Sequence, residues 1–247
     1  MTSILALDSS SENCSVALYH QQTMFELSEH APRKHTQLIL PLAQSLLARQ
    51  ETALSDLGAI AFGAGPGSFT GIRIAAGVAQ GLAYGLDVPI YAISNLKALA
   101  LQSYLKHGVS CVLSCLDARM SEVYWGLFKV SIDQDDTGPQ ADTTLKRYRV
   151  DALGPERVGA PETVNLSLLD QDNADIGIAG VGSGLDLLNE SVLERLNVVD
   201  SQMQPSADAI AYLADTAIFN GEAGQLSEAL PSYVRDTVTW NKLPGRD

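Results

Sequence analysis

Two runs of residues could hold an anion or a nucleotide, and each follows an apolar stretch typical of a β-strand. The first is Asp8-Ser9-Ser10-Ser11, where hydroxyl groups could bind a phosphate and the acid could hold a magnesium–nucleotide through water. The second is the glycine-rich run 63–71, GAGPGSFTG, which leads into an expected helix whose first N–H groups could bind an anion. The candidate anion- or nucleotide-binding residues are Asp8, Ser9, Gly65, Gly67, Ser68 and Thr70.

A purely structural interpretation of both runs stays open. The glycine run has no lysine for a P-loop, and its glycines do not have the G-x-G-x-x-G spacing. It could be a tight turn that lets a helix pack on a sheet, and Asp8 to Ser11 could be an ordinary Asp/Ser turn. Asp117-Ala118-Arg119 could line a cleft or form an internal ion pair.

Other catalytic chemistry finds little support in the residue pattern. Ser68 does not lie in a G-x-S-x-G nucleophile motif, because Gly71 comes one residue too late. None of the four histidines is three or four residues from another, so no helical metal pair is predicted. The three cysteines are expected to be buried thiols in a reducing cytosol. The sequence therefore predicts neither catalytic nor metal-binding residues.

The elements that must position these residues repeat in the two halves of the chain. Each half begins with three strands and then alternates helices and strands, which predicts a duplicated α/β fold of two lobes, each with a mixed central sheet and flanking helices. The lobes are expected at residues 1–106, joined by part of the C-terminal tail, and at 107–247. In the first half, strands are expected at 4–7, 14–19, 23–30, 57–62 and 88–93, with helices at 34–50, 70–86 and 95–107. In the second half, strands are expected at 109–116, 122–130, 144–150, 176–179 and 198–199, with helices at 185–196 and 207–220.

Composition narrows the classes of partner. The 247 residues include 16 Lys and Arg against 29 Asp and Glu, giving a formal net charge of −13. Such a chain is a poor candidate for gripping a phosphate backbone by itself or for docking on an anionic membrane. No signal peptide or transmembrane stretch is expected, so the predicted location is the cytoplasm.

Several segments carry a resemblance to a known family. They are ILALDSS (4–10), RKHTQLILPL (33–42), GPGSFTGIRIAAGVAQGLAYGLDVPI (65–90), DARMSEVYWGLF (117–128) and PSYVRDTVTW (231–240). Together they resemble the TsaB (YeaZ) family, within the actin-like/Hsp70-like ATPase superfamily. The resemblance implies a duplicated actin-like, or ribonuclease H-like, fold.

The resemblance also implies a function. Members are subunits of the bacterial machinery that makes N6-threonylcarbamoyladenosine at position 37 of tRNAs reading ANN codons, in which the paralogue TsaD is the catalyst and carries an H-x-x-x-H metal pair. Those histidines would fall at Asn95 and Leu99 of this chain, and leucine cannot bind a metal. The chain is therefore expected to be a non-catalytic dimerisation and scaffold subunit that binds and activates TsaD. An active ATPase or kinase of the same superfamily is the alternative, weak ATPase activity is left open, and a peptidase finds no supporting motif.

The resemblance further implies partners and an interface. The partners would be TsaD in a heterodimer, TsaE and the threonylcarbamoyl-adenylate synthase, with tRNA contacted mainly through the complex. Whether the chain alone is a homodimer or a monomer is left open. No cofactor of its own is expected, although the complex could hold ATP or ADP. The helices at 34–50 and 70–86 would form a four-helix bundle with the same pair of a partner. The interface candidates are His35, Leu38, Ile39, Leu42, Leu46, Ile72, Ala75, Ala76, Ala79, Leu82 and Ala83.

Two further sequence features bear on helix packing and on contact with tRNA. Three glycines recur every fourth residue in the second of these helices, at 77, 81 and 85, and predict that it packs tightly against a neighbour. The few basic residues cluster at Arg33-Lys34 and at Lys146, Arg147 and Arg149, where they could touch tRNA at the margin of a complex.

Overall fold

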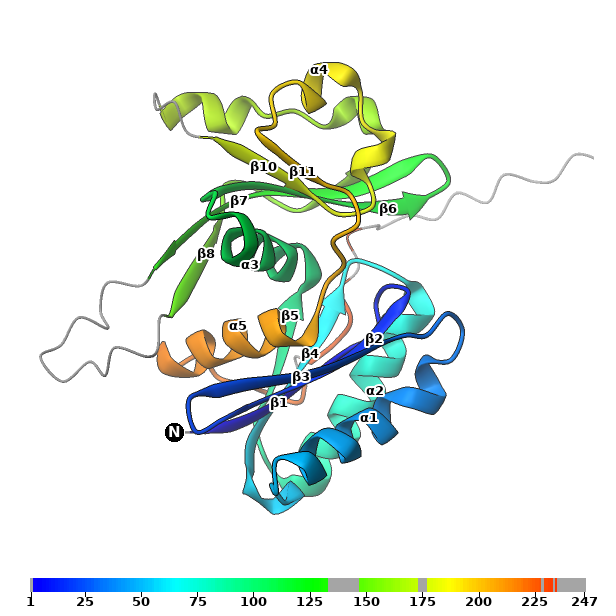
Figure 1. Cartoon of the computed structure of the whole chain (residues 1–247), viewed down its shortest axis with the longest axis vertical. Coiled ribbons are helices and arrows are strands. Elements are labelled where there is room, and N and C mark those ends of the chain that lie inside the picture. The colour runs from blue at the N-terminus through cyan, green and yellow to red at the C-terminus, as the bar shows by residue number, and fades with distance from the viewer. Residues whose placement is uncertain (1, 133–146, 173–176, 228, 233, 235–247) are drawn as a thin grey trace, which may run out of the picture.

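The structure is a computed structural model that describes residues 2–132, 147–172, 177–227, 229–232 and 234. It contains two β-sheets, each formed by one half of the chain (Figure 1). The first half comprises β1 (Ser3–Asp8), β2 (Asn13–His20), β3 (Thr23–His30), α1 (His35–Arg49), β4 (Leu57–Gly65), α2 (Phe69–Leu86), β5 (Ile90–Ser94) and α3 (Asn95–His107). The second comprises β6 (Cys111–Arg119), β7 (Glu122–Ile132), β8 (Tyr148–Ala152), β9 (Arg157–Gly159), β10 (Ile178–Val181), α4 (Glu190–Leu193), β11 (Val198–Asp200) and α5 (Ala207–Phe219).

The two sheets have the same topology. The strand order is β3-β2-β1-β4-β5 in the first sheet and β8-β7-β6-β10-β11 in the second, where β9 also pairs with β7. In each sheet the first three strands are antiparallel, and the last two are parallel to the first. The prediction of a duplicated α/β fold with mixed sheets and flanking helices is confirmed.

Each half gives its last helix to the sheet of the other half. Helix α3 packs against β6 and β7, whereas α5 packs against β1 and β2. The two helices contact each other and lie between the sheets in Figure 1. The division into lobes at residue 106 stays a prediction, and α3 lies at that boundary.

The alternation of strand residues sorts the core into layers. Leu5 and Leu7 point toward α1 and α2, while Ile4 and Ala6 point toward α5. Alanines dominate the layer between sheet and α5, which lets the helix approach the strands closely. These alanines are Ala6, Ala17, Ala59 and Ala61 on the strands and Ala209, Ala211 and Ala214 on α5.

Several elements differ from the sequence expectations. The helix expected at 185–196 is divided into a 3₁₀ turn, Leu185–Leu187, and the short α4, because Leu188 and Asn189 have extended backbone. Strand β9 was not predicted, and β4 continues through Gly65, which was expected to belong to the glycine loop. The expected polar turn at 133–142, Lys146 and most of the expected arm at 231–240 lie outside the described residues.

None of the helices within the described ranges is long and apolar enough to cross a bilayer.

Candidate functional site

Asp8 ends strand β1 inside the protein. Its side chain is fully buried, and its Oδ2 accepts hydrogen bonds from the Ser10 N–H at 3.2 Å and from the Ser10 hydroxyl at 3.1 Å. Burial raises the pKa of Asp8 to about 7, and the hydrogen bonds from Ser10 offset part of that rise. A group with this pKa can carry a proton near neutral pH.

Gly63 on β4 gives Asp8 the space it occupies. A Cβ at Gly63 would lie 2.1 Å from Asp8 Oδ1 and 2.5 Å from Asn95 Oδ1, so no side chain other than hydrogen fits there. Asn95 is the fully buried first residue of α3, and its Nδ2 donates to the Pro66 carbonyl at 3.2 Å. The ends of β1 and β4 and the start of α3 therefore meet at one corner.

The two predicted anion-binding runs contact each other directly at this corner. The Ser68 N–H donates to the Ser10 carbonyl at 2.7 Å, and the Ser9 hydroxyl donates to the Gly71 carbonyl at 2.8 Å. A Cβ at Gly71 would lie 1.8 Å from the Ser9 carbonyl oxygen. At this corner the glycine run 63–71 therefore packs directly on the turn formed by residues 8–11.

Two N–H groups at the start of α2, those of Ser68 and Gly71, are already used within the chain. Ser68 is the N-cap, and its Oγ accepts from the Gly71 N–H at 3.2 Å. The structure brings Asp8, Ser9, Gly67 and Ser68 together at this corner. A Cβ at Gly65 would instead meet Ile72 and Ser232, and Thr70 is exposed in the first turn of α2. This geometry favours the structural interpretation of both runs, and anion or nucleotide binding by them stays a prediction.

The second half has a matching corner without a buried acid. The Gly184 N–H donates to the Cys115 carbonyl at 3.0 Å, and a Cβ at Gly182 would lie 2.3 Å from that carbonyl oxygen. Asp117 is partly exposed and forms an ion pair with Arg119, with 3.0 Å between Oδ2 and Nη1. Its N–H donates to the Ser183 hydroxyl at 3.2 Å. Asp117-Ala118-Arg119 could line a cleft or form an internal ion pair. The structure contains the ion pair, but at an exposed position and not inside the protein.

Most of the predicted interface residues lie in the chain's own core, and their role in an interface stays a prediction. Helix α1 carries two apolar stripes, and both pack against the first sheet, as does the alanine face of α2, so little of these side chains is available to a partner. The stripes are Leu38, Leu42 and Leu46, and Ile39, Ala43 and Leu47. Half-buried candidates are His35, Leu38 and Leu82; buried ones are Ile39, Leu42, Leu46, Ile72, Ala75, Ala76, Ala79 and Ala83.

A different face of α2 is open. A Cβ added at Gly77, Gly81 or Gly85 would meet no atom within 4 Å, and Tyr84 beside them is 79% exposed. The expectation that these glycines allow a close neighbour is not met within the chain: they face outward. The four-residue spacing places these glycines on one face of the helix. It does not predict whether that face packs against the rest of the chain or is exposed.

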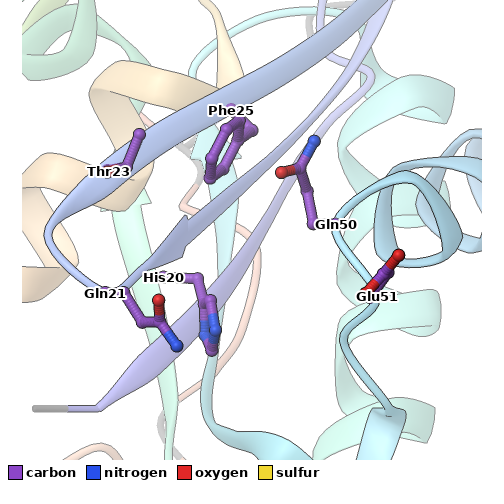
Figure 2. A pocket seen from close by; sticks show the side chains of 6 residues that line it. All are labelled: His20, Gln21, Thr23, Phe25, Gln50 and Glu51. Carbon is purple, nitrogen blue, oxygen red and sulfur yellow. The ribbon is translucent and has the colours of Figure 1, made fainter.

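A shallow, polar hollow of about 340 Å³ lies elsewhere on the surface. It is lined by His20, Gln21, Thr23, Phe25, Gln50 and Glu51, from the β2–β3 hairpin and the end of α1 (Figure 2). None of the predicted site residues lines it. Among the described residues, no group of three or more His, Cys, Asp or Glu side chains could hold a metal ion.

The doubled sheet order, with a glycine turn closing each corner, defines a protein of the duplicated actin-like fold. A family profile described as "TsaD: tRNA N6-adenosine threonylcarbamoyltransferase" matches residues 27–233. The chain is 37% identical to "tRNA threonylcarbamoyladenosine biosynthesis protein TsaB" from Escherichia coli K12, over 99% of both chains. It is also 37% identical to the protein of that name from Haemophilus influenzae, over 99% of this chain and 98% of the relative.

Solved structures agree with these relatives. "YeaZ from Pseudomonas aeruginosa" superposes with a TM-score of 0.79 at 37% identity, covering 94% of this chain and all of that one. A second structure, described as an uncharacterized protein with similarity to peptidase YEAZ from the same organism, has a TM-score of 0.79 at 38% identity, covering 95% of this chain and all of that one. The chain belongs to the TsaB (YeaZ) family.

Proposed function

We propose that the chain is a non-catalytic subunit that binds and activates a TsaD-type threonylcarbamoyltransferase, in the cytoplasm, during formation of N6-threonylcarbamoyladenosine in tRNA. The relatives are named for biosynthesis of this modified nucleoside. The observation that carries the non-catalytic part is the residue pair at the start of α3. By the resemblance, the two metal-binding histidines expected of a TsaD catalyst would fall at Asn95 and Leu99.

Burial of this pair supports the proposal further. Asn95 and Leu99 are both fully buried, and Asn95 uses its amide to hold Pro66. A leucine side chain has no atom that can ligate a metal, and a buried amide is a weak ligand at best. Activity would therefore have to come from a partner.

The surface on which a partner would dock is the outward face of α2. Gly77, Gly81 and Gly85 would let the backbone of another helix come close. Half-buried Leu82 follows Gly81 on α2, and half-buried Leu38 lies on α1. This face replaces the buried residues as our proposed centre of a four-helix bundle with TsaD. A homodimer through the same face is the arrangement that we expect when TsaD is absent.

Other partners in the proposal are TsaE and the threonylcarbamoyl-adenylate synthase, with tRNA bound mainly through the complex because the chain carries a net charge of −13. Any ATP or ADP would be held by the complex, since the corner at Asp8 is closed by backbone contacts. An ATPase acting at this corner is for that reason the less favoured function.

Reconstitution tests the proposal. Purified TsaD, TsaE, the synthase and unmodified tRNA are incubated with threonine, bicarbonate and ATP, with and without this chain, and the modified nucleoside is quantified after digestion. The chain alone should produce none, and omitting it should abolish or strongly reduce the yield. Modification by the chain alone, or an equal yield without it, would overturn the proposal.

The docking face is tested with a matched pair of arginine variants. Gly81→Arg adds a long cation where the chain offers open space, so the monomer should fold while TsaD binding and tRNA modification are lost. Ser191→Arg adds the same group to an exposed position on α4 and should leave both unchanged. Intact binding by a folded Gly81→Arg variant would move the interface elsewhere.

A further inference from the structure

The corner at Gly63 contains two buried oxygen atoms that lack a hydrogen-bond donor. Asp8 Oδ1 and Asn95 Oδ1 are both unpartnered, and both lie within 2.5 Å of the point where a Cβ of Gly63 would be. Both side chains are 0% exposed. Buried polar atoms without a partner are rare in native proteins and call for an explanation.

The two oxygens of Asp8 are treated very differently. Oδ2 accepts two hydrogen bonds from Ser10, whereas Oδ1 has no partner and lies, like Asn95 Oδ1, beside the position of a Gly63 Cβ. If Asp8 were ionised, a buried charged oxygen without a hydrogen-bond donor would lie near the oxygen of a buried amide. Such an arrangement costs free energy that the observed contacts do not offset.

Turning the amide of Asn95 over does not remove the difficulty. Its nitrogen would then face Asp8, but its oxygen would face the Pro66 carbonyl at the position that the nitrogen now holds, 3.2 Å away. Two acceptors would still oppose each other. In both orientations the corner is one hydrogen short.

We propose that Asp8 supplies this hydrogen: in the folded chain at mildly acidic pH it is a neutral carboxylic acid whose Oδ1–H donates to Asn95 Oδ1. One proton then satisfies both unpartnered oxygens, while Oδ2 keeps its bonds from Ser10 and the Asn95 amide keeps Pro66. Asp8 is thus a positioning residue, which fixes the start of α3 and the Pro66 turn against the end of β1. This role is independent of the proposed scaffold function.

The surroundings of Asp8 support the neutral form. Burial is the main cause of its raised pKa, and the carboxylate of Glu26 on β3 raises it further. Cys14 on β2 is the other titratable neighbour, and burial raises its own pKa to about 12, so it stays a neutral thiol. The contacting residues from β4 and α3, Gly63 and Asn95, do not titrate. No cation among these groups opposes protonation.

The sign of the pH effect follows from the raised pKa. The folded chain binds the proton more tightly than the unfolded chain, whose Asp8 has an ordinary pKa near 3.8. Asp8 therefore contributes stability that is complete below that value and is lost as the pH rises toward about 7. Between the two values, the unfolding equilibrium constant should rise about tenfold per pH unit.

Carboxyl NMR on the whole chain tests the protonation directly. With ¹³C only in aspartate carboxyl groups, one resonance should keep the protonated chemical shift at about pH 5.5 and titrate near neutrality, and it should vanish in Asp8→Asn. The side-chain amide signals of Asn95 should shift with the same midpoint. An Asp8 resonance already at the ionised position at that pH, or Asn95 signals that ignore the Asp8 midpoint, would overturn the proposal.

Stability measurements on variants of Asp8 and Glu26 provide a second test. In Asp8→Asn a neutral N–H replaces the acid O–H, so the variant should fold without needing the proton. From pH 5 to 7 the unfolding constant of the wild type should rise roughly 50- to 100-fold relative to Asp8→Asn. Burial also raises the pKa of Glu26 to about 7, so the control repeats the comparison in a Glu26→Gln background, where the Glu26 contribution is absent. The ratio between Glu26→Gln and the double variant Asp8→Asn/Glu26→Gln should rise by a similar factor. A constant ratio between wild type and Asp8→Asn would contradict a protonated Asp8.

Discussion

At the scale of single residues, the effect of replacing a glycine on stability depends on the atoms that surround its Cα. Gly63 lies under Asp8 and Asn95, where a Cβ would approach their oxygens to 2.1 and 2.5 Å. Gly77 lies in the middle of α2, where a Cβ would meet nothing. The same substitution at the two positions should therefore have opposite effects.

We expect Gly63→Ala to lower the free energy of unfolding by about 1–3 kcal/mol, because two buried polar side chains must move. Gly77→Ala should raise it by up to about 1 kcal/mol, since alanine favours the helix and no contact is disturbed. Urea denaturation of both variants measures the difference. Equal effects of the two changes would show that the corner at Gly63 is looser than described.

The cysteines give a second prediction at this scale. Cys14 and Cys115 are 0% exposed, and burial raises the pKa of each thiol to about 12. At pH 8 the reactive thiolate should be about a thousandfold scarcer than for a thiol with a pKa of 9. Iodoacetamide should therefore alkylate these two cysteines only as fast as the chain unfolds. The same reagent applied in denaturant, where all three cysteines should react at once, is the control.

At the scale of elements, each face of α2 has a different environment. Ala79 is 0% exposed against the first sheet, while Gly81, two residues on, is open to solvent. A helix surface changes from one face to the other within two residues, so neighbouring positions can separate effects on folding from effects on binding.

Ala79→Arg and Gly81→Arg make that separation testable. Ala79→Arg places a cation in the core and should cost about 3 kcal/mol or more of unfolding free energy. Gly81→Arg should leave stability unchanged or raise it by roughly 0.5–1 kcal/mol, because arginine is a better helix former than glycine. Thermal unfolding of the two variants decides the point. Equal destabilisation by both would mean that Gly81 is covered within the chain.

Local sequence signals predicted some elements to the residue and failed at others. Helix α3 occupies the predicted range 95–107, because Ser94 caps its start by accepting the Lys97 N–H and Gly108 ends it with a left-handed backbone. The range 185–196 has helical apolar spacing, but Asn189 starts the short α4 and interrupts it; an asparagine followed by Glu190 was the available signal.

The candidate site shows the same division. The sequence places Asp8, Ser9 and the glycine run at the ends of neighbouring strands, and they do meet. The backbone atoms of Ser9 and Gly71 are in contact because α2 lies very close to the end of β1. No local sequence pattern predicts how close the helix and the strand are. The sequence likewise did not show that Ile39 and Ala79 are buried within the chain. An apolar stripe on a helix can pack against the chain's own sheet or against another subunit, and its pattern is the same in both cases.

At the scale of the whole molecule, the exchange of α3 and α5 joins the two halves. A chain of aromatic contacts crosses the joint: Tyr19 on β2 meets Tyr212 on α5, which meets Tyr148 on β8, with ring centroids 6.4 and 6.1 Å apart. Arg147 in the second half forms an ion pair with Asp215 on α5 at 3.3 Å, where both side chains are largely buried. The inner face of each sheet is therefore covered by a helix from the other half.

This arrangement predicts that neither half folds well alone. A fragment of residues 1–106 lacks α5, so Ala6, Ala17 and Ala61 would lose their cover and the fragment should aggregate or remain poorly structured. The full chain should then unfold in one cooperative transition, seen as equal calorimetric and van't Hoff enthalpies. Coexpression of 1–106 with 107–247 is the matched control, since each fragment supplies sheet contacts that the other lacks, and should recover a soluble pair. Two separate transitions, or a 1–106 fragment with a cooperative unfolding curve of its own, would show that the helix exchange is dispensable for folding.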